Sequence, residues 1–162
     1  MLDLRKPKGP VFFWDRRPFW GAYPETCYAP IRPVNLASKE ERARLSTSAL
    51  KGFFRLTDRW NLRDEDAKQL LGGVANGTYY KMKRHPENRV LDPDTLLRIS
   101  YLLGIFKALN SLHGQTLADD WISLPNSNRI FGGGTPLAYM ISGGLPAMNT
   151  VRRLLDARQA GL

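Results

Sequence analysis

The segment from Asp92 to Leu112 constrains the fold of this chain more than any other. Asp92-Pro93 is a typical helix start, because the acid can cap the first turn and proline at the first helical position has no N–H to lose. Gly104 lies inside the segment and costs about 0.8 to 1.0 kcal/mol relative to alanine, unless close helix packing uses the missing side chain. The apolar residues cover well over one stripe, so we expect a long helix buried between two packed layers. They are Leu96, Leu97, Ile99, Leu102, Leu103, Ile105, Phe106, Ala108, Leu109 and Leu112.

Helix signals recur on both sides of this segment. Ser38 is followed three residues later by Glu41, which is a capping-box pattern, and Ser46 to Ser48 can cap a second helix. Period-2 alternation over four or more residues is nearly absent, apart from an ambiguous run at 11–14. We therefore expect an all-helical (all-α) fold without internal repeats. Further helices are expected at about 48–60, 64–71, 74–84, 117–124, 136–142 and 146–160.

The first 37 residues differ in composition from the rest of the chain. They hold six of the eleven prolines, a density that no helix tolerates, together with seven aromatic residues. So many aromatics are unusual for a solvated tail, and we expect an extended arm that packs either on its own core or on a partner. The aromatic residues are Phe12, Phe13, Trp14, Phe19, Trp20, Tyr23 and Tyr28.

The charge balance favours a polyanionic partner. The chain has 24 Lys plus Arg against 15 Asp plus Glu, a formal net charge of +9 with a pI near 10.0. Nine basic and five acidic residues give +4 in 1–44, eleven and seven give +4 in 45–114, and four and three give +1 in 115–162. A phosphate-binding surface should therefore lie in the first two segments, which leaves the third for another task.

The sequence offers no metal site, cofactor site or catalytic centre. Cys27 is the one cysteine, and it forms no cluster at zinc-ligand spacing with His85 and His113. The glycine-rich runs at 131–136 and 72–77 lack the spacing and the preceding strand of nucleotide-binding loops. We therefore expect no enzyme activity, no cofactor and no metal. The basic start precedes only four apolar residues, too few for a signal peptide, so we expect a cytoplasmic protein with no membrane association.

Residues 64–84 have the pattern of a helix-turn-helix. Two short helices are joined by a turn at Gly72-Gly73, and the second is apolar on one face and basic and aromatic on the other. Placed in the major groove of operator DNA, the outer face would offer lysine and arginine to phosphates or guanine, and asparagine to adenine. The alternative is a solvated basic face. The candidate DNA-binding residues are Asn76, Thr78, Tyr80, Lys81, Lys83 and Arg84.

The last third of the chain carries a more specific pattern. Trp121, Pro125-Asn126, FGGGTPL at 131–137, Met140, the glycine pair at 143–144 and VRRLLDARQAG at 151–161 together resemble the Xre/MbcA/ParS antitoxin family. The resemblance is close through 117–162, fair over the helix-turn-helix at about 50–112 and absent from 1–37.

This resemblance implies the antitoxin of a type II toxin–antitoxin system. Such an antitoxin has an Xre-like helix-turn-helix, here at 45–114, that represses its own operon, and a C-terminal toxin-binding domain, here at 115–162, after an arm and short helix at 1–44. The usual partner is a RES-domain toxin that consumes NAD or modifies a target with it, so the NAD site belongs to the toxin. A helix-turn-helix normally reads two half-sites, so we expect a homodimer within a hetero-oligomer.

The family pattern also assigns a toxin-binding surface. Arg152 and Arg153 are the preferred contacts, because arginine forms bidentate pairs and their apolar neighbours face inward. Three positions depart from the family: Leu154 stands in place of a frequent tyrosine, and Arg63 and Ala75 in place of helix-capping serines. By position the toxin-binding residues are Trp121, Asn126, Phe131, Gly132, Pro136, Leu137, Met140, Gly143, Arg152, Arg153, Asp156 and Gly161, some of which must belong to the core.

Two other functions fit the same residues. A solitary transcriptional regulator of this fold would bind DNA in the absence of a toxin gene next to its own. An RNA-binding or scaffold protein would use the aromatic arm to stack on single strands.

Overall fold

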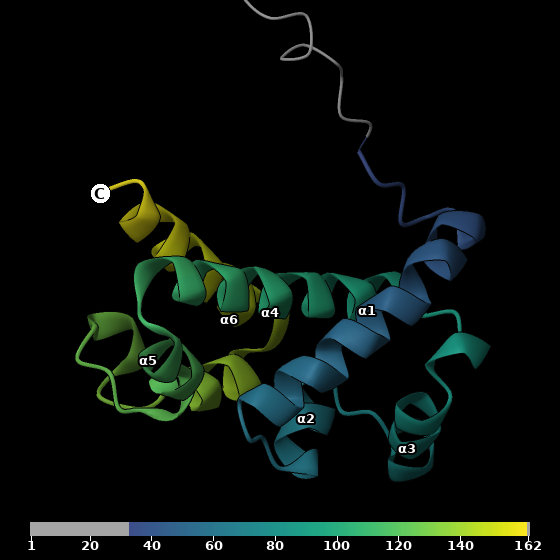
Figure 1. Cartoon of the computed structure of the whole chain (residues 1–162), viewed down its shortest axis with the longest axis horizontal. Helices are drawn as coiled ribbons and strands as arrows, with labels where there is room; N and C mark the ends of the chain where they lie inside the picture. The colour runs from purple at the N-terminus through teal and green to yellow at the C-terminus, as the bar shows by residue number, and fades with distance from the viewer. Residues whose placement is uncertain (1–32, 162) are drawn as a thin grey trace, which may run out of the picture. The chain divides into compact units, whose positions relative to one another are not determined.

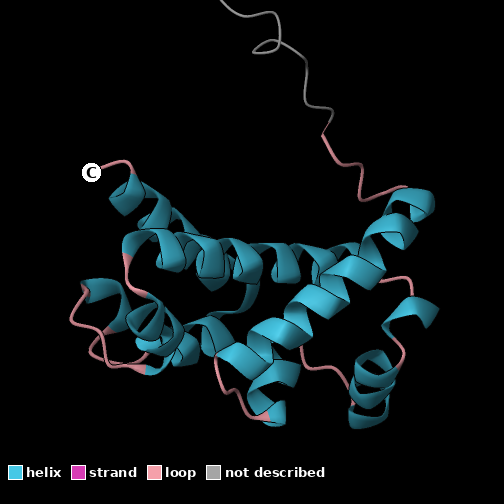
Figure 2. Ribbon diagram, in the orientation of Figure 1, coloured by secondary structure: helices cyan, strands magenta, loops and turns pink. Residues whose placement is uncertain are grey.

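The computed structural model describes residues 33–161, and these are entirely helix and loop (Figures 1 and 2). The prediction of an all-α fold is therefore confirmed for this part of the chain. The expectations for the N-terminal arm fall mostly on residues 1–32, outside the described residues. In chain order the elements are α1 (Lys39–Arg59), α2 (Asp64–Leu70), α3 (Asn76–Arg84), η4 (Pro86–Asn88), α4 (Pro93–Leu112), α5 (Gln115–Asp120), η5 (Trp121–Ser123), η6 (Arg129–Phe131) and α6 (Pro136–Gln159).

α4 is the predicted long helix, and its start and its burial are confirmed. The Asp92 carboxylate accepts hydrogen bonds from the Thr95 backbone N–H at 2.9 Å and from the Thr95 hydroxyl at 2.7 Å. α1 packs against one side of α4 and α6 against another. This arrangement buries the apolar surface that extends round the helix, which a single neighbour could not cover. The fully buried apolar residues of α4 are Leu96, Ile99, Leu102, Ile105, Ala108 and Leu109.

At Gly104 a side chain of α6 lies directly against the backbone of α4. A methyl group at this position would lie 3.0 Å from Cζ of Arg152 and closer still to Nη1, so the guanidinium occupies the place of a side chain. On another side of α4, Leu103 lies against Gly52 of α1, where an added Cβ would stand 3.3 Å from the leucine Cδ1. The absence of a side chain at Gly52 and at Gly104 therefore allows close helix packing at both places, which is the condition under which a glycine inside α4 is tolerated.

α1 differs from the prediction. Its start is the expected one, since the Ser38 hydroxyl accepts from the Glu41 backbone N–H at 3.3 Å. The helix then continues across residues 44 and 45, where a boundary was expected, and the second helix cap at Ser46 to Ser48 is wrong. The buried Ser46 hydroxyl instead donates to the Arg42 carbonyl at 2.6 Å and accepts from the Leu91 N–H at 2.8 Å. A residue type that favours caps thus serves here to tie α1 to the segment before α4.

α6 contains the break expected at its glycine pair. Gly144 has φ 60° and ψ −144°, a conformation essentially reserved for glycine, and it divides the element into two helical parts. At Gly143 a Cβ would stand 2.6 Å from Cβ of Ala147, so the turn leaves no room for a side chain there either. Pro146 lies in the first turn after the break, where its missing N–H is not needed. The glycines set the angle at which the second part of α6 meets α4.

The helix-turn-helix and the C-terminal region share one core. Met148, Val151 and Leu155 of α6 belong to the same apolar cluster as Phe53 of α1 and Leu70 of α2. α6 contacts α2 as well as α4, so the expected regions 45–114 and 115–162 are packed together through the described residues. The two regions are therefore distinguished by the functions proposed for them and not by separate cores.

Substitution at the α6 break provides a test of this geometry. Gly144→Ala should lower the free energy of unfolding by about 1 to 3 kcal/mol, because alanine is strained in this backbone conformation. Gly77→Ala is the matched control: Gly77 lies in α3 with nothing within 4 Å of an added Cβ, so this change should be neutral or stabilising. Urea unfolding of both variants measures the difference, and equal stabilities would contradict the assigned break.

Candidate functional site

α2 and α3 form a helix-turn-helix around two glycines with positive φ. Gly72 (φ 100°) and Gly73 (φ 79°) donate backbone hydrogen bonds to the carbonyls of Gln69 and Lys68 at 2.9 Å each, which ends α2 and reverses the chain. Arg98 of α4 lies beneath this turn, with Nε 3.3 Å from the place of a Gly72 Cβ. The turn is therefore fixed by backbone conformation and by contact with the central helix.

α3 has the two faces that its sequence predicts. Tyr79 and Met82 are buried, and the Tyr79 ring packs edge-on against Phe54 of α1, with 5.6 Å between centroids. Val74, expected to face inward, is half-buried. The predicted DNA-binding residues share the outer face, since Thr78 is half-buried and the others are exposed: Asn76, Tyr80, Lys81, Lys83 and Arg84.

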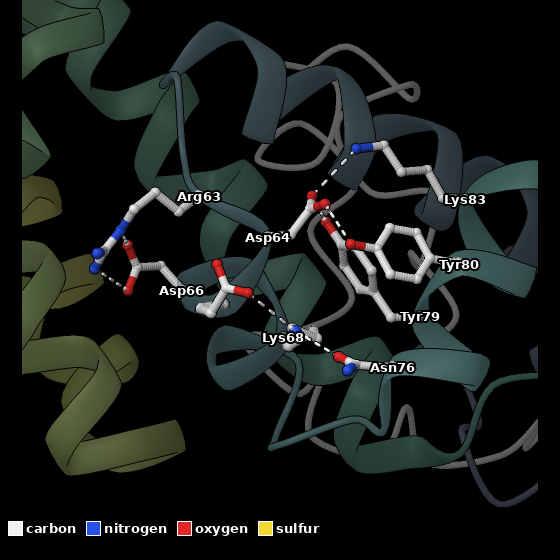
Figure 3. Close-up of polar contacts among 9 residues, drawn as sticks. Arg63, Asp64, Asp66, Lys68, Asn76, Tyr79, Tyr80 and Lys83 are labelled. Carbon is white, nitrogen blue, oxygen red and sulfur yellow. Dashed lines mark hydrogen bonds and ion pairs between the residues drawn. The ribbon is translucent and has the colours of Figure 1, made fainter.

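Asp64, the first residue of α2, is a meeting point for donors from α3 (Figure 3). Its carboxylate accepts from the Tyr79 hydroxyl at 3.0 Å, from the Tyr80 hydroxyl at 2.9 Å and from the Lys83 ammonium at 3.2 Å. The Lys83 Nζ also stands 5.9 Å from the centre of the Tyr79 ring. One carboxylate therefore holds two of the predicted DNA contacts and orients the outer face of α3.

This network changes the acidity of its members in opposite directions. The Tyr80 hydrogen bond is the strongest influence that holds the pKa of Asp64 below its ordinary value of 3.8, with burial acting against it and Tyr79 and Lys83 adding to it. The pKa of Tyr79 is raised, first by burial and then by its bond to Asp64. The pKa of Tyr80 is raised by the hydrogen bond to the same carboxylate. At neutral pH the site thus contains an ionised aspartate between two protonated phenols.

Asn76 is held from α2 by a second contact. Its side-chain oxygen accepts from the Lys68 ammonium at 2.5 Å, and the same ammonium stands 3.5 Å from a Glu65 carboxylate oxygen (Figure 3). Recognition of adenine by asparagine uses both its oxygen and its nitrogen, so an adenine would share the Asn76 oxygen with Lys68 or displace Lys68 from it. Among residues 33–161, Thr78, Lys81 and Arg84 make no side-chain hydrogen bond.

The helices of the motif lack side-chain caps. Arg63 and Ala75 occupy the N-cap positions of α2 and α3, and neither caps through its side chain. These are two of the three positions at which we expect a departure from the family pattern. The acids in the first turn of α2 compensate in part through the helix dipole, and Arg63 Nε binds Asp66 at 2.9 Å.

The predicted toxin-binding residues divide between core and surface. Trp121 and Phe131 pack edge to face with 5.9 Å between ring centres, and Asn126 shapes the following loop by accepting from the Asn128 N–H at 2.9 Å. The set as a whole is therefore not one exposed surface. Buried members are Trp121, Phe131, Pro136 and Met140; half-buried members are Asn126, Leu137, Arg152 and Asp156; exposed members are Gly132, Gly143, Arg153 and Gly161.

The two arginines preferred as toxin contacts have different surroundings. Arg152 donates through Nε to Asp156 at 2.9 Å and fills the space over Gly104, so it helps to join α6 to α4. Arg153 is exposed and forms no ion pair within the described residues. In Figure 1, α3 and α5 lie on opposite sides of α1, so DNA at α3 would leave the α5 side accessible.

Sequence reasoning missed Asp64 and Lys68 as parts of the site. Locally, Asp64 is only an acid in the first turn of a helix, and its partners Tyr79, Tyr80 and Lys83 lie 15, 16 and 19 residues away. A local pattern does not show such pairs. The signal that could have found them is the coincidence of an acid at the start of the first helix with tyrosines and a lysine on the second.

Residues 33–161 contain no group of three or more histidine, cysteine, aspartate or glutamate side chains arranged to hold a metal ion. No helix among them is long and apolar enough to cross a membrane.

The Asp64 network makes stability depend on pH. Because folding lowers the pKa of Asp64, its contribution is complete above the ordinary value of 3.8 and is lost as the pH falls through the lower folded value. Asp64→Asn should therefore reduce the free energy of unfolding at pH 7 and reduce the loss of stability on acidification. Asp120→Asn, at an exposed residue without an ion pair in 33–161, is the control. Identical urea-unfolding profiles for these variants from pH 7 to 2.5 would contradict the network.

Comparisons with known proteins place this helix-turn-helix in a family. The antitoxin Xre-like helix-turn-helix domain matches residues 38–104, from the N-cap of α1 to Gly104 of α4. The uncharacterized protein y4oB of Sinorhizobium fredii (strain NBRC 101917 / NGR234) is 36% identical over 130 residues, which cover 80% of this chain and 98% of y4oB. No solved structure matches the chain. The chain therefore belongs to the same family as y4oB, and its segment from α1 to α4 is similar to the helix-turn-helix domain of Xre-type antitoxins.

Proposed function

We propose that this chain is the antitoxin of a type II toxin–antitoxin system, that it represses its own operon through α3, and that it blocks a RES-type, NAD-consuming toxin through its C-terminal region. The observation that carries the proposal is an Xre-like antitoxin helix-turn-helix whose second helix turns a basic, polar face to solvent. This chain contributes no chemistry to the toxin's reaction, because an antitoxin acts by occluding the active site of its partner.

The proposed operator interface is the outer face of α3. Arg84 and Lys81 carry charges that no carboxylate among residues 33–161 neutralises, and they suit phosphates or guanine edges. Lys83 and Asn76 already contact Asp64 and Lys68, and we propose that they exchange these partners when DNA binds. The proposal therefore includes an exchange of partners, in which phosphate or base edges replace side chains of α2. Two copies of α3 in a homodimer would read half-sites about 34 to 36 Å apart.

Replacement of Lys83 and Arg84 by alanine tests the operator interface. Binding to duplex DNA from upstream of the gene should weaken, and the dependence of log K on log salt should become shallower by about 0.9 for each phosphate that the variant no longer neutralises. Fluorescence anisotropy between 50 and 200 mM salt measures this slope. Lys107→Ala removes an exposed charge from α4 and should leave the slope unchanged. A slope equal to that of the wild type in the double variant would exclude these two residues from the phosphate contacts.

The proposed toxin interface is centred on the second part of α6. Arg153 is exposed and can pair with a carboxylate of the toxin, whereas Arg152 already serves the packing of α6 on α4. The resemblance at 117–162 supports a RES-type toxin, and residues 115–162 are nearly neutral, as expected for a region that does not bind nucleic acid. Exposed Gly132 and Gly143 add backbone that a partner can approach closely.

Co-expression with the neighbouring open reading frame tests the toxin interface. Expressed alone, the toxin should stop growth and lower cellular NAD, and this chain should restore both. Arg153→Glu should abolish rescue with its stability unchanged, while Arg152→Glu should lower stability as well, because it removes the guanidinium over Gly104.

Three outcomes separate the alternatives. Loss of growth without loss of NAD, rescued by this chain, would assign the toxin another target. No effect of the neighbouring gene would favour a solitary DNA-binding regulator. Rescue that survives Arg153→Glu would remove that residue from the interface.

A further inference from the structure

A hollow of about 300 Å³ with polar and charged residues around it lies just beyond the end of α3. It is lined by Lys81 from the last turn of that helix, His85 at its C-cap, Asn88 of η4 and Arg89. Its wall is fixed by backbone hydrogen bonds, because the His85 N–H donates to the Lys81 carbonyl at 2.9 Å and the Asn88 N–H donates to the His85 carbonyl at 3.2 Å. The hollow is therefore formed by the ordered backbone that connects α3 to η4 and continues to Arg89.

The side chains around this hollow are mainly hydrogen-bond donors. They offer an ammonium, a guanidinium, an imidazole and an amide within one small space. Glu87 is the carboxylate at its edge and stands 3.4 Å from Nδ1 of His85. Lys81 and Arg89 form no ion pair with any residue of 33–161.

Lys81 and Arg89 share with Arg84 the absence of a carboxylate partner among residues 33–161, whereas the other cations of the motif are paired. Lys83 is neutralised by Asp64, Arg63 by Asp66, and Lys68 lies beside Glu65. A cation that already has a carboxylate partner is partly neutralised and attracts a phosphate less strongly than an unpaired cation does. The positive charge most available to a polyanion is therefore at the C-terminal end of α3.

We propose that this hollow binds one backbone phosphate of the operator, with Lys81 and Arg89 on the phosphate oxygens and the Asn88 amide as a further donor. The inference rests on the proposed DNA-binding function and deepens it, because His85, Asn88 and Arg89 lie outside the helix face that reads bases. Arginine matches phosphate through two parallel N–H bonds, and the two cations offset the partial negative charge that the carbonyls at a helix C-terminus place there.

Another hollow of similar volume shows why charge alone does not suffice. It lies between α1 and α4 and has Leu56, Leu103 and Phe106 in its wall. Arg59 at its edge is bound to Asp119 at 2.8 Å. Arg55 also lines that hollow and forms no ion pair within residues 33–161, but it is a single free cation beside an apolar wall, whereas the hollow at the end of α3 has two.

The charge of the hollow gives a quantitative test. In the full-length protein, Lys81→Gln with Arg89→Gln should make the salt dependence of binding to the upstream duplex shallower by about 0.9, the value for one phosphate. Each single variant should reduce the slope about as much as the pair does, because both side chains hold the same phosphate. The control is Lys107→Gln with Arg158→Gln, which removes two exposed charges from α4 and the last turn of α6. Thermal unfolding of every variant checks that the fold is retained.

A chemical change in the DNA identifies the phosphate itself. Duplexes with one neutral methylphosphonate, placed at each backbone position in turn, should include a position where wild-type affinity falls and the affinity of the Lys81→Gln, Arg89→Gln variant does not. Wild-type protein that fails to bind the duplex would overturn the proposed repressor function and the phosphate site with it. Normal wild-type binding with an unchanged slope in the variant would overturn the phosphate site alone. If the variant bound the DNA duplex as tightly as wild type does and lost affinity only for RNA of the same sequence, the assignment of the site to DNA would be overturned.

Discussion

The burial of α4 on two sides is the constraint on which the rest of this structure depends. A helix with apolar residues around most of its circumference is stable in water only when neighbours cover it on more than one side. α1 and α6 do so, and each comes close because a glycine removes a side chain at the contact, Gly52 opposite Leu103 and Gly104 opposite Arg152. The two helices are thereby held in place by the same element, although they belong to different proposed functions.

Arg98 extends this connection to the candidate interfaces. It pairs with Asp94 on α4 at 2.6 Å, and its guanidinium lies between the turn at Gly72 and the break at Gly144. Both glycines have positive φ, so both segments are fixed by backbone geometry as well as by contact. A partner that moved the second part of α6 would press on the residue that supports the helix-turn-helix. Arg98 thus adds a polar contact between the two regions, which already share one apolar core.

The features that the sequence predicted correctly are those with local causes. Asp92-Pro93 begins α4 and the glycine pair at 143–144 breaks α6, because caps and positive φ depend on neighbouring residues. The cap predicted at Ser46 is wrong, since its partner Leu91 is 45 residues away and the same hydroxyl satisfies the helix interior. The packing role of Arg152 escapes the sequence for the same reason: its contact with Gly104 exists only once α6 packs on α4.

The pairing of individual charges cannot be predicted from the composition of the sequence. A net charge of +9 points to a polyanion, but it treats every lysine and arginine alike. Folding places Asp64 against Lys83, and so removes from the recognition face a charge that the helical pattern had placed there. It leaves Lys81 and Arg89 around a hollow with no carboxylate of their own in the described chain. Because a carboxylate partner partly neutralises a cation, the acids of α2 determine which cations of α3 attract a phosphate most strongly.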